Sequence, residues 1–193
     1  MMRIVAVLAA VLALQACTAI TEVRPSEPVV INGALAVQPT KIWSRLASTE
    51  LAESNLDVWT MDGHYLDRLC FVAGLEDNQS IHKTAPYGVP EPVFHSNMGA
   101  VEVMELFEAV MSRGTPAMFR ASGLRPERFA GVNGFRFDFT FVSQSDEVAR
   151  NGLAVGAVHK GRLYLIYYYG ARLHYFGKNL PEVEAIIKSA KLQ

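Results

Sequence analysis

The chain has 193 residues, which is enough for one domain with a sizeable core and too short for two domains of ordinary size. Hydrophobic residues make up 50% and charged residues 19%, which excludes disorder along the whole chain. The 18 Lys and Arg residues balance 19 Asp and Glu residues, so no basic field is available to attract a nucleic acid. Two cysteines cannot form a disulfide framework.

The N-terminal segment has the features of a secretory signal. Arg3 precedes an unbroken apolar run from Ile4 to Leu14. This run is shorter than the roughly 20 residues that span a bilayer, and suits the apolar region of a signal peptide. The run closes with Leu14-Gln15-Ala16-Cys17, which resembles the bacterial lipobox, although Gln15 replaces the small residue more usual there. The resemblance implies that residues 1–16 are removed and that Cys17 becomes the acylated first residue.

Lipidation of Cys17 implies a permanent anchor. Three acyl chains bury about three times the methylene groups of one chain, at about 0.8 kcal/mol each, so release from the membrane is negligible. Thr18 stands where an aspartate retains such lipoproteins in the inner membrane, so the resemblance implies the outer membrane, facing the periplasm. We expect residues 17–32, with Pro25 and Pro28, to form an irregular tether.

A single globular domain is expected over residues 33–193, beginning with a short strand at Ala34–Val37. Trp43 is expected in the core. Leu56–Thr60 and Tyr65–Ala73 predict a hairpin around the turn Asp62-Gly63.

The second half of the domain has clearer patterns. A helix is predicted from Gly99, after the capping types Ser96 and Asn97, to Gly114. Four phenylalanines alternate along Phe135–Val142, which predicts a strand with one buried face. A second hairpin is predicted at Leu153–His159 and Arg162–Tyr169, and Pro181 is expected to open a final helix.

These elements predict an α+β fold with an antiparallel sheet of about five to six strands covered by two helices. The long helix, the aromatic strand pair with its Lys160-Gly161 turn, and the closing helix with Ile186-Ile187 resemble PsbP-like accessory domains. That resemblance implies helices on both faces of the sheet. It also implies a non-catalytic accessory or assembly module, as in small bacterial lipoproteins of unknown function.

The segment Leu75–Met98 is the candidate site of function. Its apolar residues follow neither a helix nor a strand period, and it contains three prolines. Loops of this length are usually functional or mobile. We predict that it contacts a protein partner, because stiffened loops lose little entropy on docking and aromatic anchors dominate interface energies. The candidate partner-contact residues are Tyr87, Phe94, His82 and His95. The alternative is that Tyr87 and Phe94 fold back and pin the loop to the domain.

No catalytic or cofactor signature occurs in the sequence. There is no Gly-x-Ser-x-Gly elbow or phosphate loop, and we expect no enzyme activity, cofactor or metal. His82, Glu91 and His95 share the loop, but nothing holds both histidines on one side of an element. Cys70 lies in an apolar strand and is expected to be an inert buried thiol.

Two functions are therefore weighed. The first is a lipid-anchored envelope lipoprotein that acts as a non-catalytic interaction or accessory module for an envelope protein. The second is a small-ligand-binding protein or weak hydrolase with a site formed by the loop 75–98. The lack of catalytic motifs favours the first.

Overall fold

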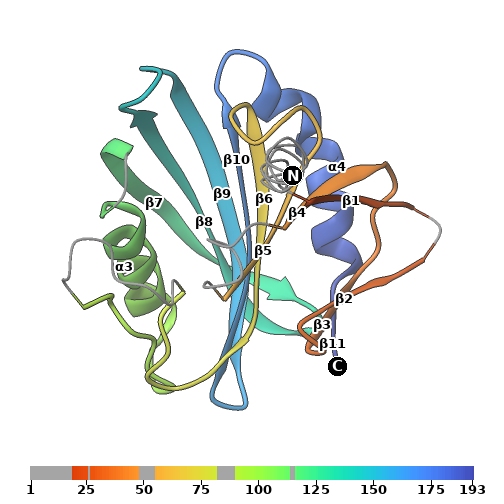
Figure 1. Cartoon of the computed structure of the whole chain (residues 1–193). Helices are drawn as coiled ribbons and strands as arrows, with labels where there is room; N and C mark the ends of the chain where they lie inside the picture. The colour runs from red at the N-terminus through yellow and green to blue at the C-terminus, as the bar shows by residue number, and fades with distance from the viewer. Residues whose placement is uncertain (1–18, 26, 48–54, 82–89, 114–115) are drawn as a thin grey trace, which may run out of the picture.

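The computed structural model describes residues 19–193 except 26, 48–54, 82–89 and 114–115. Its helices and strands follow the order shown in Figure 1. The strands before the first described helix are β1 (Ala19–Val23), β2 (Val29–Ile31), β3 (Leu35–Val37), β4 (Trp43–Ala47), β5 (Leu56–Thr60) and β6 (Asp67–Leu75). The later elements are α3 (Ala100–Met111), β7 (Pro116–Phe129), β8 (Val132–Ser143), β9 (Ala149–His159), β10 (Arg162–Ala171), α4 (Tyr175–Ser189) and β11 (Lys191–Leu192).

Most strands belong to one antiparallel sheet. Its eight strands lie in the order β1-β4-β5-β6-β10-β9-β8-β7, and a smaller sheet of three has the order β11-β3-β2. The expected antiparallel sheet with two helices is confirmed for the described residues. The expected number of five to six strands is too low, so the domain is mostly sheet.

The sheet carries one helix on each face, with α3 on one side and α4 on the other (Figure 1). Two apolar clusters follow from this layering. One packs α4 against the sheet through Val183, Ile186 and Ile187. The other packs α3 through Val103, Phe107 and Val110.

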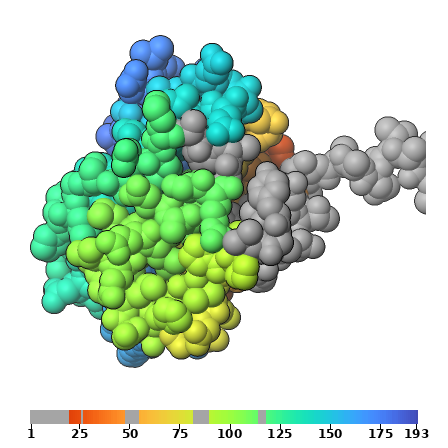
Figure 2. Space-filling model, turned by 90° about the vertical axis from the view of Figure 1, so that its left-hand side faces the viewer, coloured from red at the N-terminus to blue at the C-terminus, as the bar shows by residue number. Residues whose placement is uncertain are grey.

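The alternating phenylalanines of β8 build the α3 side of the core. Phe135, Phe137, Phe139 and Phe141 are all buried, as the alternation predicts. The ring of Phe107 on α3 lies 5.3 Å from that of Phe137 and 5.1 Å from that of Phe139, measured between centroids. Figure 2 views the molecule from this side, with residues 90–113 in yellow-green to green across its centre.

The strand β10 is central, as its two apolar faces predict. It pairs with β6 on one side and β9 on the other. Tyr164 and Tyr168 belong to the α4 cluster, whereas Leu163 and Tyr167 belong to the α3 cluster. Trp43 is also buried as expected.

Two predicted boundaries are wrong. The link between β5 and β6 covers residues 61–66 rather than the two-residue turn Asp62-Gly63, and β6 begins at Asp67. The last helix begins at Tyr175, six residues before Pro181. The side-chain hydroxyl of Tyr168 donates to the carbonyl of Tyr175 at 2.9 Å, and its ring stacks on Phe176. These contacts hold the first turn of α4 in place. Pro181 therefore lies inside the helix, where its missing N–H removes one helical hydrogen bond.

The expected tether is also wrong over its described part. Ala19–Val23 forms β1, which pairs with β4 in register from Ala19↔Ala47 to Val23↔Trp43. Val29–Ile31 forms β2, and both Val23 and Ile31 are buried. The folded domain therefore includes residues 19–25 and 27–32, which the sequence suggested were irregular.

Candidate functional site

The predicted contact loop is held at its base. The amide of Asn78 donates to the carbonyl of Phe94 at 2.8 Å, and the amide of Phe94 donates to the carbonyl of Gln79 at 2.9 Å. The amide of Ser96 donates to the Asp77 carboxylate at 2.7 Å. These bonds join residues 77–79 to residues 94–96, and Ile81, which follows them, is buried in the α3 cluster.

The structure separates the four candidate contact residues. Phe94 is fully buried in the α3 cluster, so it is not available as a partner contact, and the alternative that it folds back and pins the loop to the domain holds for this residue. His95 is exposed, with its Nδ1 atom 3.8 Å from a carboxylate oxygen of Asp77. His82 and Tyr87 lie outside the described residues, and their role as contacts stays a prediction.

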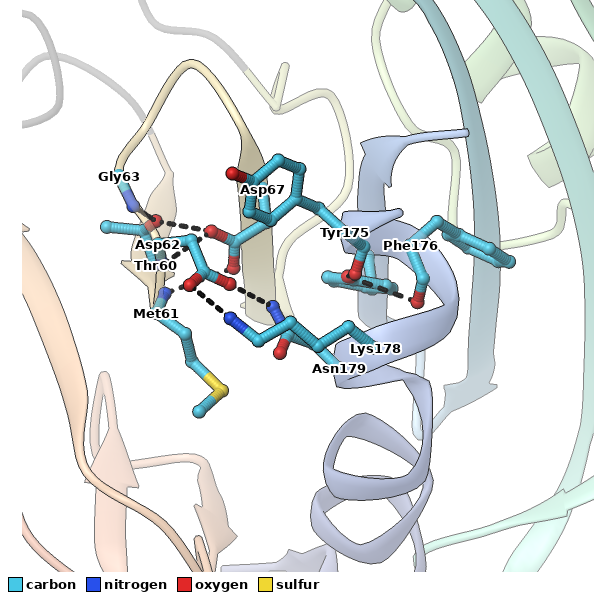
Figure 3. Close-up of polar contacts among 10 residues, drawn as sticks. Thr60, Met61, Asp62, Gly63, Asp67, Tyr175, Phe176, Lys178 and Asn179 are labelled. Atoms are coloured by element: carbon cyan, nitrogen blue, oxygen red, sulfur yellow. Dashed lines mark hydrogen bonds and ion pairs between the residues drawn. The ribbon is translucent and has the colours of Figure 1, made fainter. Parts of the chain in front are cut away.

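A polar cluster that the sequence did not predict lies between the β5–β6 link and α4 (Figure 3). The carboxylate of Asp62 accepts hydrogen bonds from Lys178 and, at 2.8 Å, from the amide of Asn179. Partial burial raises the pKa of Asp62, but the bonds from Lys178 and Asn179 outweigh it and leave the pKa below its ordinary value. Asp62 therefore stays ionised and ties the hairpin to the first turns of α4.

Asp67 organises the link itself. Its carboxylate accepts hydrogen bonds from the hydroxyl of Thr60 at 2.8 Å and from the amides of Met61 at 3.0 Å and Asp62 at 2.8 Å. The amide of Gly63 in turn donates to the Thr60 hydroxyl at 2.9 Å. Burial raises the pKa of Asp67 despite these bonds. The arrangement closes the turn, with the donors supplied by the chain around it.

A second carboxylate docks the middle of α4. Glu182 is 3% exposed and accepts hydrogen bonds from the amides of Thr40 at 2.7 Å and Lys41 at 3.0 Å, and from the Thr40 hydroxyl. The indole of Trp43 lies 3.5 Å away as a further donor. Burial raises the pKa of Glu182, but these donors outweigh it and lower the pKa overall. The ionised side chain thus joins α4 to the segment between β3 and β4.

Glu182→Gln is expected to lower the free energy of unfolding by about 1–3 kcal/mol at pH 7, because the amide cannot accept every donor that faces the carboxylate. The folded-state pKa of Glu182 lies below its ordinary 4.5. Its stabilisation is therefore complete above that value and is lost as the pH falls through the folded pKa. Urea unfolding at pH 7 and pH 3 should show the difference between parent and variant shrinking in acid.

The matched control is Glu105→Gln, which makes the same change on the exposed face of α3 and should leave stability within about 0.5 kcal/mol of the parent. A parent–variant difference for Glu182→Gln of equal size at both pH values would contradict the role of its charge.

The single described cysteine behaves as the sequence predicts. Cys70 is a free thiol and only 2% exposed. Burial raises its pKa to about 12, although a hydrogen bond with Tyr167 and the charge of Arg68 pull it down. The thiol is therefore protonated at neutral pH and shielded from reagents.

Around Asp62, Asp67 and Glu182, carboxylates, amides and hydroxyls satisfy one another. Within this part of the chain, no group of three or more His, Cys, Asp or Glu side chains is arranged to hold a metal ion. No described helix is long and apolar enough to cross a bilayer. What the geometry does explain is how the hairpin, the β3–β4 segment and α4 are held as one body.

A large antiparallel sheet with a helix on each face is the architecture that the resemblance to PsbP-like domains implies. The chain matches no protein-family model and no curated protein sequence. Among solved structures, it is similar to the solution structure of cyanobacterial PsbP (CyanoP) from Synechocystis sp. PCC 6803. The TM-score is 0.57 at 11% sequence identity, and the match covers 94% of this chain and 96% of that chain. The PsbP-like architecture expected from the second half of the sequence therefore extends over nearly the whole chain.

A second similarity is to the crystal structure of LpqN, which is involved in cell envelope biogenesis of Mycobacterium tuberculosis. The TM-score is 0.36 at 11% identity, and the match covers 90% of this chain and 91% of that chain. A TM-score at this level does not establish a common fold, so the PsbP-like fold rests on CyanoP.

Proposed function

We propose that this protein is a lipid-anchored envelope lipoprotein, acylated at Cys17 and held in the outer membrane with its domain facing the periplasm. The domain acts as a non-catalytic accessory or interaction module for an envelope protein. Support for the accessory role comes from the PsbP-like fold, which covers 94% of the chain. Support for the anchor comes from the lipobox-like boundary at residues 14–17.

The use of three buried or partly buried carboxylates agrees with a non-catalytic role. Asp62, Asp67 and Glu182 each accept two or more hydrogen bonds from the chain itself. General acid or base work needs a carboxylate with an oxygen free to reach a substrate proton. In these three residues the oxygens hold structural elements together instead.

The anchor is tested by Cys17→Ser, which removes the thiol that would receive the lipid. We expect the variant to move from the membrane to the soluble fraction and to lose incorporation of an alkyne-labelled palmitate. The matched control Cys70→Ala removes the other thiol of the chain and should stay in the membrane. An unchanged membrane fraction for Cys17→Ser would overturn the anchor.

The interaction role is tested with the same lipidated protein. Affinity capture from detergent-solubilised envelopes, followed by mass spectrometry, is expected to recover one envelope protein in proportion to the bait. His82, Tyr87 and His95 remain the contact residues proposed in the loop, and replacing Tyr87 and His95 with alanine should reduce capture without changing the melting temperature. Capture that is unaffected by the double replacement would remove the loop from the proposal.

A further inference from the structure

The position of β1 limits how far the domain can stand from its anchor. Only Thr18 separates Cys17 from Ala19, the first residue of β1. Two fully extended residues reach about 7 Å. A tether up to residue 32 would have allowed roughly 50 Å on the same scale. An acylated Cys17 would therefore hold the start of β1 at the bilayer surface.

The strand that begins there is an outer edge of the eight-stranded sheet. Its backbone pairs with β4 on one side, and the sheet order leaves the other side without a neighbouring strand among the described residues. Its register with β4 shows no bulge. Sheet edges of this kind attract further strands unless they are protected or covered.

The opposite edge is protected by different means. The strand β7 has register shifts between Ala117 and Arg120 and between Ser122 and Arg125. It also carries three exposed arginines, Arg120, Arg125 and Arg128. Bulges and charged side chains are the usual protection of an edge. The strand β1 has no bulge and carries one charged side chain, the exposed Glu22, so its edge is less protected than that of β7.

Exposed aliphatic side chains flank the pair β1–β4 at both ends. Ile20 is 63% exposed and lies one residue into β1. Ile42 is 55% exposed and directly precedes Trp43, which pairs with Val23 at the far end of β1. The cation Lys41 is exposed beside Ile42. Aliphatic side chains next to a cation suit the boundary between acyl chains and headgroups.

We infer that the β1–β4 edge of the sheet rests on the membrane, with Ile20 and Ile42 in the headgroup region of the lipid layer that holds the anchor. The inference rests on the proposed lipidation of Cys17. Water and lipid headgroups then satisfy the free backbone groups of β1, and the bilayer prevents another chain from pairing there. The edge formed by β7 lies seven strand spacings away, roughly 34 Å along the sheet, and faces the periplasm.

The test attaches an environment-sensitive fluorophore to single introduced cysteines in the full-length lipidated protein. Ile20→Cys and Ile42→Cys report on the proposed contact. The controls are Met118→Cys on β7 and Leu173→Cys between β10 and α4, which are 76% and 96% exposed in the parent. Acylation blocks Cys17, and Cys70 is 2% exposed, so neither takes up the label in the folded protein.

The labelled proteins are reconstituted into vesicles of phosphatidylethanolamine and phosphatidylglycerol, some of them carrying a nitroxide lipid. We expect blue-shifted emission and several-fold stronger quenching at positions 20 and 42 than at positions 118 and 173. In the Cys17→Ser background without vesicles, all four positions should emit as exposed probes.

Equal quenching at all four positions in protein that floats with the vesicles would overturn the membrane contact and leave the anchor intact. Protein that does not float with the vesicles would instead overturn the anchor. Probes at 20 and 42 that respond only when envelope proteins are added would assign the edge to a protein partner and also overturn the inference.

Discussion

Phe107→Ala is expected to lower the free energy of unfolding by about 3–5 kcal/mol, because it leaves a large cavity beneath α3. Phe107 is 1% exposed. Its ring lies between 5.1 and 5.9 Å from the rings of Phe119, Phe137, Phe139 and Tyr167. The side chain thus joins the helix to three strands, and surrounding rings cannot close the space without leaving their own contacts. Urea unfolding followed by circular dichroism measures the change.

Val101→Ala is the matched control for this helix. Val101 lies six residues nearer the start of α3 and is 55% exposed, so its truncation should change stability by no more than about 0.5 kcal/mol. A urea midpoint for Phe107→Ala that equals that of Val101→Ala would show that α3 does not pack on the phenylalanine face of β8.

The sequence predicted those parts of the fold in which the pattern of apolar residues is regular within a single helix or strand. The alternation of Phe135, Phe137 and Phe139 predicts β8 because every second residue of a regular strand meets the same face. Apolar residues on both faces of Arg162–Tyr169 likewise predict a central strand, which the structure extends to Ala171. Such patterns need no knowledge of what lies across the sheet.

The edge strand β7 could not be predicted in this way. Its two register shifts break the alternation between faces, and Pro116 and Pro126 suggest a loop. Pairing with β8 alone makes residues 116–129 a strand. The short strands β1 and β2 are similar cases, because five and three residues are too few to show a period.

The polar contacts were beyond prediction for a different reason. Asp62 meets Asn179 across 117 residues of chain, and Glu182 meets Thr40 across 142 residues. No local spacing connects such partners. Likewise, Phe94 looks like an exposed contact residue by its setting in a proline-rich loop, and only the packing of the loop base shows that it is buried.

Gly152→Ala is expected to lower the free energy of unfolding by about 1–3 kcal/mol, as overpacking of a dense core does. An alanine Cβ at this position of β9 would lie 2.2 Å from the nearest ring atom of Phe139, well inside van der Waals contact. Phe139 cannot easily move away, because Phe107 and Phe119 lie against the same ring. The glycine therefore makes the space that the phenylalanine fills.

A double-mutant cycle identifies this contact as the cause. In the Phe139→Ala background the ring is gone, so adding Gly152→Ala should cost at least about 1 kcal/mol less than it does in the parent. Gly177→Ala is a control that is expected to raise the free energy of unfolding by about 0.5–1 kcal/mol, because alanine is favoured over glycine inside a helix. Nothing lies within 4 Å of the added Cβ at this position. An equal cost of Gly152→Ala in both backgrounds would mean that backbone strain in β9, rather than the Phe139 ring, requires the glycine.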